Sequence, residues 1–184
     1  MPQRRLALLV TAALVLAAAP ARADGYFHTP LDLDACDVIK TYEAGGADLR
    51  CDGYGGFDVF VSEGDARTDV DFGVNNDRFQ TFSAFNGIGQ TVEWLETENG
   101  VEAATIRFLI DVDGRKAQAL VVSKIGLADT PGCVVGIVDA AVEQANGVAR
   151  GLAALAPLFD CASDPIAIVP GANDLVKDFS GAQQ

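Results

Sequence analysis

Histidine and methionine are nearly absent from this chain, which has one of each, and basic residues are scarce. Thirteen Lys and Arg residues stand against 26 Asp and Glu residues, so the formal net charge is −13. Nucleic acids and anionic membrane surfaces require a basic protein surface, and the composition argues against both as partners. The acidity permits a cationic protein, a small ligand or a divalent metal, or it serves only to keep an exported protein soluble.

The chain also lacks the motifs of common catalytic sites. It contains no G-x-S-x-G, H-E-x-x-H, Walker A or G-x-G-x-x-G pattern. The C-x-x-C spacing of redox and zinc sites is missing, and His28 is the only histidine available to a catalytic base. Asp111 to Gly114 resembles the start of a calcium loop, but Arg115 occupies the third ligand position, so we predict a hairpin turn there. We therefore assign no catalytic residue, metal or cofactor.

What the sequence does contain begins with a predicted signal peptide, residues 1–23. Arg4 and Arg5 precede an apolar run from Leu6 to Ala19, and residues 21–23 form an A-x-A cleavage site. The run is too short for a membrane anchor. Without residues 1–23, which hold three arginines and no acidic residue, ten basic residues face 26 acidic ones, a formal charge of −16. Residues 24–184 have the length expected of one exported domain.

Four cysteines in an exported chain predict two disulfides. Three pairings are possible, and proximity in sequence favours Cys36–Cys51 and Cys133–Cys161. We interpret the cysteines as structural links between neighbouring segments.

Alternation of apolar and polar residues predicts strands through most of residues 36–138. Asn99-Gly100 is a strong hairpin signal, and the apolar run 133–138 is typical of a strand buried on both faces. A helix is predicted over residues 139–156, capped by Asp139, and an irregular tail over 162–184. The expected fold is α+β: one antiparallel sheet of about six to eight strands, bent or barrel-like, with the C-terminal helix packed on it.

Two further predictions concern faces and side chains. In the strand 66–72 the alternation turns Val70 and Phe72 inward and leaves three polar residues on a solvent-facing surface. These are Arg67, Asp69 and Asp71. The segment 75–86 changes period, and we predict a short helix in which Phe79, Phe82 and Phe85 share one face as core or as the wall of an apolar pocket.

Several short motifs are spread along the chain: Arg50-Cys51, Glu63-Gly64-Asp65 with Arg67, residues 82–86 (FSAFN), and Pro131-Gly132-Cys133. In these motifs the chain resembles a group of exported proteins common in alphaproteobacteria. The resemblance covers most of residues 24–184 and implies a periplasmic location in a Gram-negative cell. It implies no activity, because none is known for the group.

The candidate binding residues are Glu63, Asp65 and Arg67, although a surface ion pair or a clamp on the preceding turn is the favoured explanation of Arg67. The preferred hypothesis is a periplasmic, non-enzymatic binding module, in its sharpest form an inhibitor of a cationic envelope enzyme such as a lysozyme. One alternative is a carboxylate-based hydrolase of envelope glycans. Its two carboxyls would come from Glu63, Asp65, Asp69, Asp71, Glu93 and Glu96. A second alternative is a carrier of a small apolar ligand beside the three phenylalanines.

Overall fold

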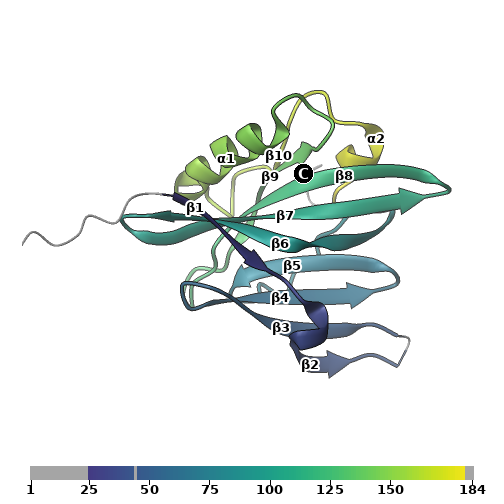
Figure 1. The fold of residues 1–184 in the computed structure, drawn as a ribbon, viewed down its shortest axis with the longest axis horizontal. Helices are drawn as coiled ribbons and strands as arrows, with labels where there is room; N and C mark the ends of the chain where they lie inside the picture. Colours follow the sequence, from purple (N-terminus) through teal and green to yellow (C-terminus); the bar gives the residue numbers. More distant parts are fainter. Residues whose placement is uncertain (1–24, 44, 181–184) are drawn as a thin grey trace, which may run out of the picture.

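The computed structural model describes residues 25–43 and 45–180. The predicted signal peptide, residues 1–23, lies outside the described residues. Two sheets are stacked face to face, and the longer helix covers the outer face of the larger sheet, giving three layers (Figure 1).

The larger sheet has six strands in the order β1-β6-β7-β8-β9-β10. All neighbours are antiparallel except β9 and β10, which run parallel. Its strands have the following bounds: β1 Gly25–Pro30, β6 Phe85–Thr97, β7 Gly100–Val112, β8 Arg115–Lys124, β9 Cys133–Asp139 and β10 Ala167–Ile168.

The smaller sheet has four antiparallel strands in the order β2-β3-β4-β5. Their bounds are β2 Asp37–Thr41, β3 Ala47–Tyr54, β4 Phe57–Gly64 and β5 Arg67–Gly73. The 3₁₀ turn η1, Leu33–Ala35, leads from β1 of the larger sheet into β2. Because the strands divide between two sheets, the predicted single bent or barrel-like sheet is wrong, whereas the α+β class is confirmed.

The main core lies between the two sheets. Trp94 on β6 packs edge-on against Phe72 on β5, and Phe82 packs against both Phe108 on β7 and Phe179 near the chain end. All five rings are almost completely buried. Burial of large aromatic side chains is a dominant stabilising contribution in a domain of this size.

A second, smaller core lies between the larger sheet and α1, Ala145–Leu155, which continues as the 3₁₀ turn η2, Ala156–Leu158. Small residues form the buried stripe of this helix, at positions 145, 149 and 153, and allow it to lie close to the sheet. The helix begins six residues later than predicted. Asp139, the predicted cap, is instead the buried last residue of β9, where it accepts a hydrogen bond from the backbone N–H of Ala141.

Both disulfides form with the favoured pairing, Cys36–Cys51 and Cys133–Cys161. The predicted turn at Asn99-Gly100 joins β6 to β7, the turn at Asp113-Gly114 joins β7 to β8, and β9 is buried throughout. The predicted irregular tail instead contains β10 and the short helix α2, Asp174–Lys177. No helix in the described part of the chain is both long enough and apolar enough to cross a membrane.

Candidate functional site

An acidic groove lies at one end of the four-stranded sheet, on the face turned away from the core. Its base is a row of neighbouring positions on three strands: Asp48 on β3 pairs with Ser62 on β4, which pairs with Asp69 on β5. Since directly opposite residues of an antiparallel pair project from the same face, this register gathers polar side chains that are far apart in sequence.

The groove has a volume of about 610 Å³. Five carboxyl groups line it, whereas Arg78 is the one cationic side chain in its lining. The rings of Tyr42 and Phe79 also face it, and the Tyr42 hydroxyl donates a hydrogen bond to the Asp48 carboxylate over 2.7 Å. The five carboxyls belong to Asp48, Glu63, Asp65, Asp69 and Asp77. Such a lining suits a cationic group, which the carboxylates and the aromatic faces both attract.

Asp69 and Asp71 are almost completely buried, so the prediction that they face solvent is wrong. The strand alternation itself is correct, because Val70 and Phe72 do enter the core between them. The segment after β5 folds back over this face. Its residue Asn76 donates through its backbone N–H and its side-chain amide to the Asp71 carboxyl, and Gln80 N–H donates to Asp69 Oδ1.

Burial, together with the neighbouring charge of Asp71, raises the pKa of Asp69 from 3.8 to about 8. Burial also raises the pKa of Asp71, to about 6, although the hydrogen bonds from Asn76 oppose the increase. At neutral pH the acidic groove therefore contains a protonated carboxyl at Asp69 beside exposed or half-exposed carboxylates. A protonated carboxyl in such a place can donate a proton, or it can ionise when a cation approaches.

The candidate residues Glu63 and Asp65 both line the acidic groove, whereas Arg67 is absent from its lining. Asp65 and Ala66 form the two-residue turn between β4 and β5, and both have positive φ angles, of 52° and 54°. This conformation matches the twist of a hairpin but disfavours residues other than Gly, Asn and Asp.

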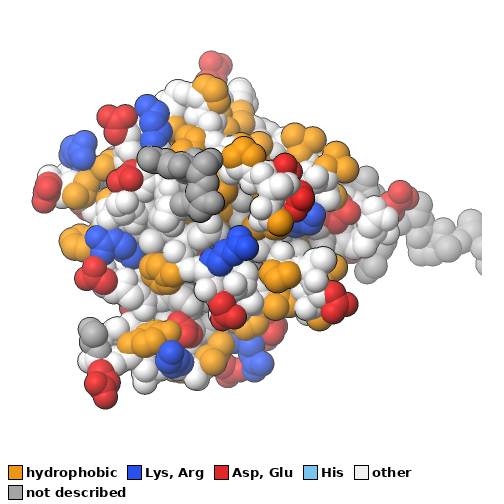
Figure 2. All heavy atoms as spheres, turned by 180° about the vertical axis from the view of Figure 1, so that it is seen from behind, with side chains coloured by type: hydrophobic (Ala, Val, Ile, Leu, Met, Phe, Trp, Pro, Cys, Tyr) orange, Lys and Arg blue, Asp and Glu red, His pale blue; other side chains and the backbone are white. Residues whose placement is uncertain are grey.

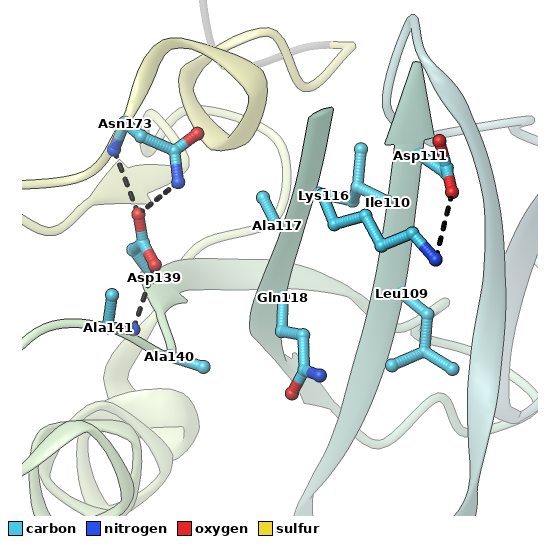
Figure 3. A pocket seen from close by; sticks show the side chains of 10 residues that line it. All are labelled: Leu109, Ile110, Asp111, Lys116, Ala117, Gln118, Asp139, Ala140, Ala141 and Asn173. Carbon is cyan, nitrogen blue, oxygen red and sulfur yellow. Dashed lines mark hydrogen bonds and ion pairs between the residues drawn. The ribbon is translucent and has the colours of Figure 1, made fainter. Parts of the chain in front are cut away.

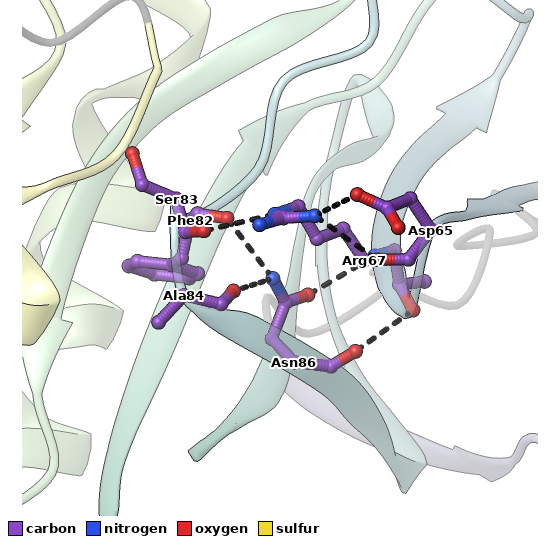
Figure 4. Close-up of polar contacts among 7 residues, drawn as sticks. Asp65, Arg67, Phe82, Ser83, Ala84 and Asn86 are labelled. Atoms are coloured by element: carbon purple, nitrogen blue, oxygen red, sulfur yellow. Dashed lines mark hydrogen bonds and ion pairs between the residues drawn. The ribbon is translucent and has the colours of Figure 1, made fainter. Parts of the chain in front are cut away.

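Arg67 stabilises that turn (Figure 4). Its guanidinium donates to the carboxylate and the backbone oxygen of Asp65, and its Nε–H donates to the backbone oxygen of Ser83 over 2.8 Å. The same group stacks on the ring of Phe85, 5.0 Å from the centroid. The structure thus shows the clamp that the sequence allowed, and Arg67 joins the hairpin to the segment that leads into β6.

The predicted helix over residues 75–86 is absent, and its three phenylalanines do not share a face. Phe82 is fully buried in the main core, whereas Phe79 and Phe85 are 49% and 52% exposed. Phe85 begins β6 and lies under Arg67, while Phe79 faces the acidic groove. The structure therefore removes the observation on which the apolar-carrier hypothesis depended.

A second groove, which sequence reasoning missed, lies between β1, β6 and β7 on one side and α1 on the other. We call it the basic groove; its volume is about 360 Å³. Within it, the Glu93 carboxylate on β6 contacts His28 Nε2 at 2.9 Å. It also accepts hydrogen bonds from Nε and Nη2 of Arg150 on α1. His28 lies on β1, which pairs along its whole length with β6. The hydrogen-bonding partner of His28 lies 65 residues away, so no local pattern could reveal it.

A third pocket, of about 580 Å³, lies between the β7–β8 hairpin and the segment that enters α2 (Figure 3). Asp139 accepts hydrogen bonds there from both the backbone and the side-chain amide of Asn173, and Lys116 pairs with Asp111 at 3.5 Å. Each charged group in this pocket has a partner within the chain, and Asp139 joins β9 to the start of α2.

The remaining carboxylates considered for hydrolysis are not brought to the acidic groove: Glu93 belongs to the basic groove, and the Glu96 carboxylate accepts a hydrogen bond from Tyr54. Within residues 25–43 and 45–180, no group of three or more His, Cys, Asp or Glu side chains is placed to hold a metal ion. Comparison with protein-family models, curated proteins and solved structures found no match.

Proposed function

We propose that this protein is a periplasmic binding module that recognises a cationic partner protein through the acidic groove. The observation that carries the proposal is the lining of that groove, which contains five carboxyl groups and two aromatic rings but one cationic side chain. A lysine or arginine side chain entering it would meet carboxylates for charge-assisted hydrogen bonds and a ring face for a cation–π contact.

The acidic groove gives this acidic chain a localised site for a cation. Figure 2 shows one face of the molecule, on which acidic, basic and apolar side chains are interspersed without one broad acidic patch. The net charge would steer a cationic protein toward the molecule at low ionic strength, and the groove would then provide the specific contact. In its sharpest form, the partner is a cationic envelope enzyme such as a lysozyme.

Export to the periplasm is part of the proposal. Two disulfides are consistent with an oxidising compartment. The predicted signal peptide and the resemblance to exported alphaproteobacterial proteins favour the same location.

The proposal is tested by measuring the activity of a lysozyme, and its affinity for this protein by calorimetry, at low salt. The groove variant is Glu63→Gln with Asp77→Asn, two positions whose carboxylates form no hydrogen bond or ion pair within the described residues. The control variant, Asp129→Asn with Glu143→Gln, changes the net charge equally at sites outside the groove lining. We expect the groove variant to bind about ten-fold more weakly, whereas the control retains most of the affinity.

Equal lysozyme activity with and without micromolar protein would reject the inhibitor form of the proposal. Equal weakening by the two double variants would show that net charge, rather than the acidic groove, determines binding.

A second candidate function is the carboxylate-based hydrolysis of envelope glycans, favoured by one observation. Asp69, with a pKa raised to about 8, lines the same groove as Glu63. Glycoside hydrolysis requires a protonated carboxyl and a second carboxyl in one cleft. This candidate predicts glycan turnover that is lost in Asp69→Asn and in Glu63→Ala, and an absence of turnover across peptidoglycan and oligosaccharide substrates would reject it.

A further inference from the structure

The charged side chains that line the basic groove are mainly cationic, although the chain as a whole is acidic. Arg107 on β7 and Arg150 on α1 line it together with His28, and Glu93 is its one carboxylate. Arg150 and His28 both contact that carboxylate, at 2.6 Å and 2.9 Å, so its charge is offset within the groove. The lining thus has an excess of cationic groups, whereas the lining of the acidic groove has an excess of carboxyls.

Arg107 retains donors that the fold does not use. Its guanidinium makes one hydrogen bond, from Nη1 to Gln118 Oε1 over 3.1 Å, and forms no ion pair within the described part of the chain. A half-buried guanidinium with free N–H groups presents a fork that matches the two oxygens of a carboxylate or phosphate.

Thr105 adds a hydroxyl group to this lining. This β7 residue is 7% exposed, and it lines the basic groove. Its hydroxyl makes no hydrogen bond among the described residues, but the oxygen itself is not fully buried; the one buried side-chain atom left unpaired in those residues is Ser123 Oγ. An oxygen-containing ligand in the groove would accept the hydrogen bond that the Thr105 hydroxyl can donate.

The start of α1 adds a favourable field. Asn146, in its first turn, lines the groove; that turn contains no acidic residue, and Gln144 before it makes no side-chain cap. The amino-terminal end of a helix carries partial positive charge and attracts anions.

From these observations we infer that the basic groove is a second binding site, which takes a small organic anion through its carboxylate or phosphate group. Arg107 contributes the guanidinium fork, Thr105 the hydroxyl and Asn146 the side-chain amide. The volume of about 360 Å³ lies in the range of small-ligand pockets. The site is independent of the acidic groove and of the function proposed for it.

The inference is tested by titrating the purified protein with succinate, inorganic phosphate or glycerol 3-phosphate at low ionic strength, with detection by calorimetry and by backbone amide NMR shifts. We expect saturable binding of at least one probe, with the largest shifts at the groove-lining residues Gln90, Thr105 and Asn146. Comparing succinate with the two phosphate probes identifies which oxyanion the site prefers.

Three variants locate the site. Arg107→Gln is expected to weaken binding about ten-fold or more, because it removes a charge-assisted interaction. Thr105→Val removes only the hydroxyl and is expected to weaken binding about three-fold or more. Arg115→Gln, on the exposed β7–β8 hairpin, changes the net charge as Arg107→Gln does, and it should leave the affinity unchanged.

An absence of saturable binding for all three probes would overturn the inference. So would equal weakening by Arg107→Gln and Arg115→Gln, or full affinity in both Arg107→Gln and Thr105→Val.

Discussion

Each groove contains a carboxyl group that is largely shielded from solvent, but only one of the two carboxyls has cationic partners. In the acidic groove, Asp69 lies beside Asp71 without a cationic partner among the described residues, and its pKa rises to about 8, so the group is neutral at pH 7. In the basic groove, Glu93 is paired with Arg150 and His28. The first arrangement leaves a site that gains a charge when a cation enters. The second leaves surplus cationic donors for an anion.

The largest expected effect comes from removing the Cys36–Cys51 disulfide, which lies near the acidic groove and not in the lining of the basic groove. Replacing Cys36 and Cys51 by alanine opens a link across 15 residues and should lower the free energy of unfolding by about 3 kcal/mol, measured by urea denaturation. The disulfide ties the start of β2 to β3, the strand that carries Asp48 of the acidic groove.

Lysozyme binding should therefore weaken in this variant, while oxyanion binding at the basic groove persists. Loss of both would show that the grooves are not independent, and retention of both would show that the disulfide does not shape the acidic groove.

Asp69→Asn should change the pH dependence of stability. The folded-state pKa is raised from 3.8 to about 8, so the unfolded chain ionises first as pH rises. The stability contributed by the protonated group is complete below about pH 4 and is lost between about pH 4 and pH 8. An asparagine keeps an acceptor for Gln80 N–H without this loss.

At pH 8 the variant should therefore be more stable than the parent, with a flatter profile of melting temperature against pH. Asp52→Asn, on the exposed part of β3, is the matched control and should follow the parent profile. A profile for Asp69→Asn that parallels the parent would mean that Asp69 is ionised in the empty groove.

Arg67→Ala should give the smallest change. It removes hydrogen bonds to Asp65 and Ser83 and the contact with Phe85, and it leaves the strained Asp65-Ala66 turn unsupported. We expect a loss of about 1–2 kcal/mol in urea unfolding, with Arg67→Lys intermediate because a lysine retains the charge but not the fork.

Arg115→Ala, an exposed arginine, should change stability by less than about 0.5 kcal/mol. If Arg67→Ala lowers the free energy of unfolding by as little as Arg115→Ala does, the Arg67 contacts do not stabilise the fold, and the side chain is available to a partner. Since Arg67 lies outside the basic groove, oxyanion binding should be unaffected in every Arg67 variant.

Local patterns were sufficient for features whose determinants are close in sequence. The alternation through residues 57–72, the Asn99-Gly100 hairpin and both disulfide pairings all agree with the structure. Each depends on strand periodicity, turn chemistry or a short loop, which neighbouring residues specify.

Long-range contacts determined what local patterns missed. The alternation correctly placed Asp69 and Asp71 on the face away from the core, but only tertiary structure shows that Asn76 and Gln80 cover that face. The same applies to the basic groove, whose Glu93 and Arg150 are 57 residues apart. The division into two sheets likewise depends on which strands pair, and periodicity carries no information about partners.

The position of Val176 and Phe179 has a consequence for when the protein can fold. Both are buried in the main core, and Phe179 packs against Phe82 at a ring distance of 4.9 Å. Ser180 N–H also donates to the backbone oxygen of Thr81. The space between the two sheets is thus completed by a segment made only after all the strands that enclose it. A nascent chain would remain open until this segment has emerged, an order compatible with the export proposed for this protein.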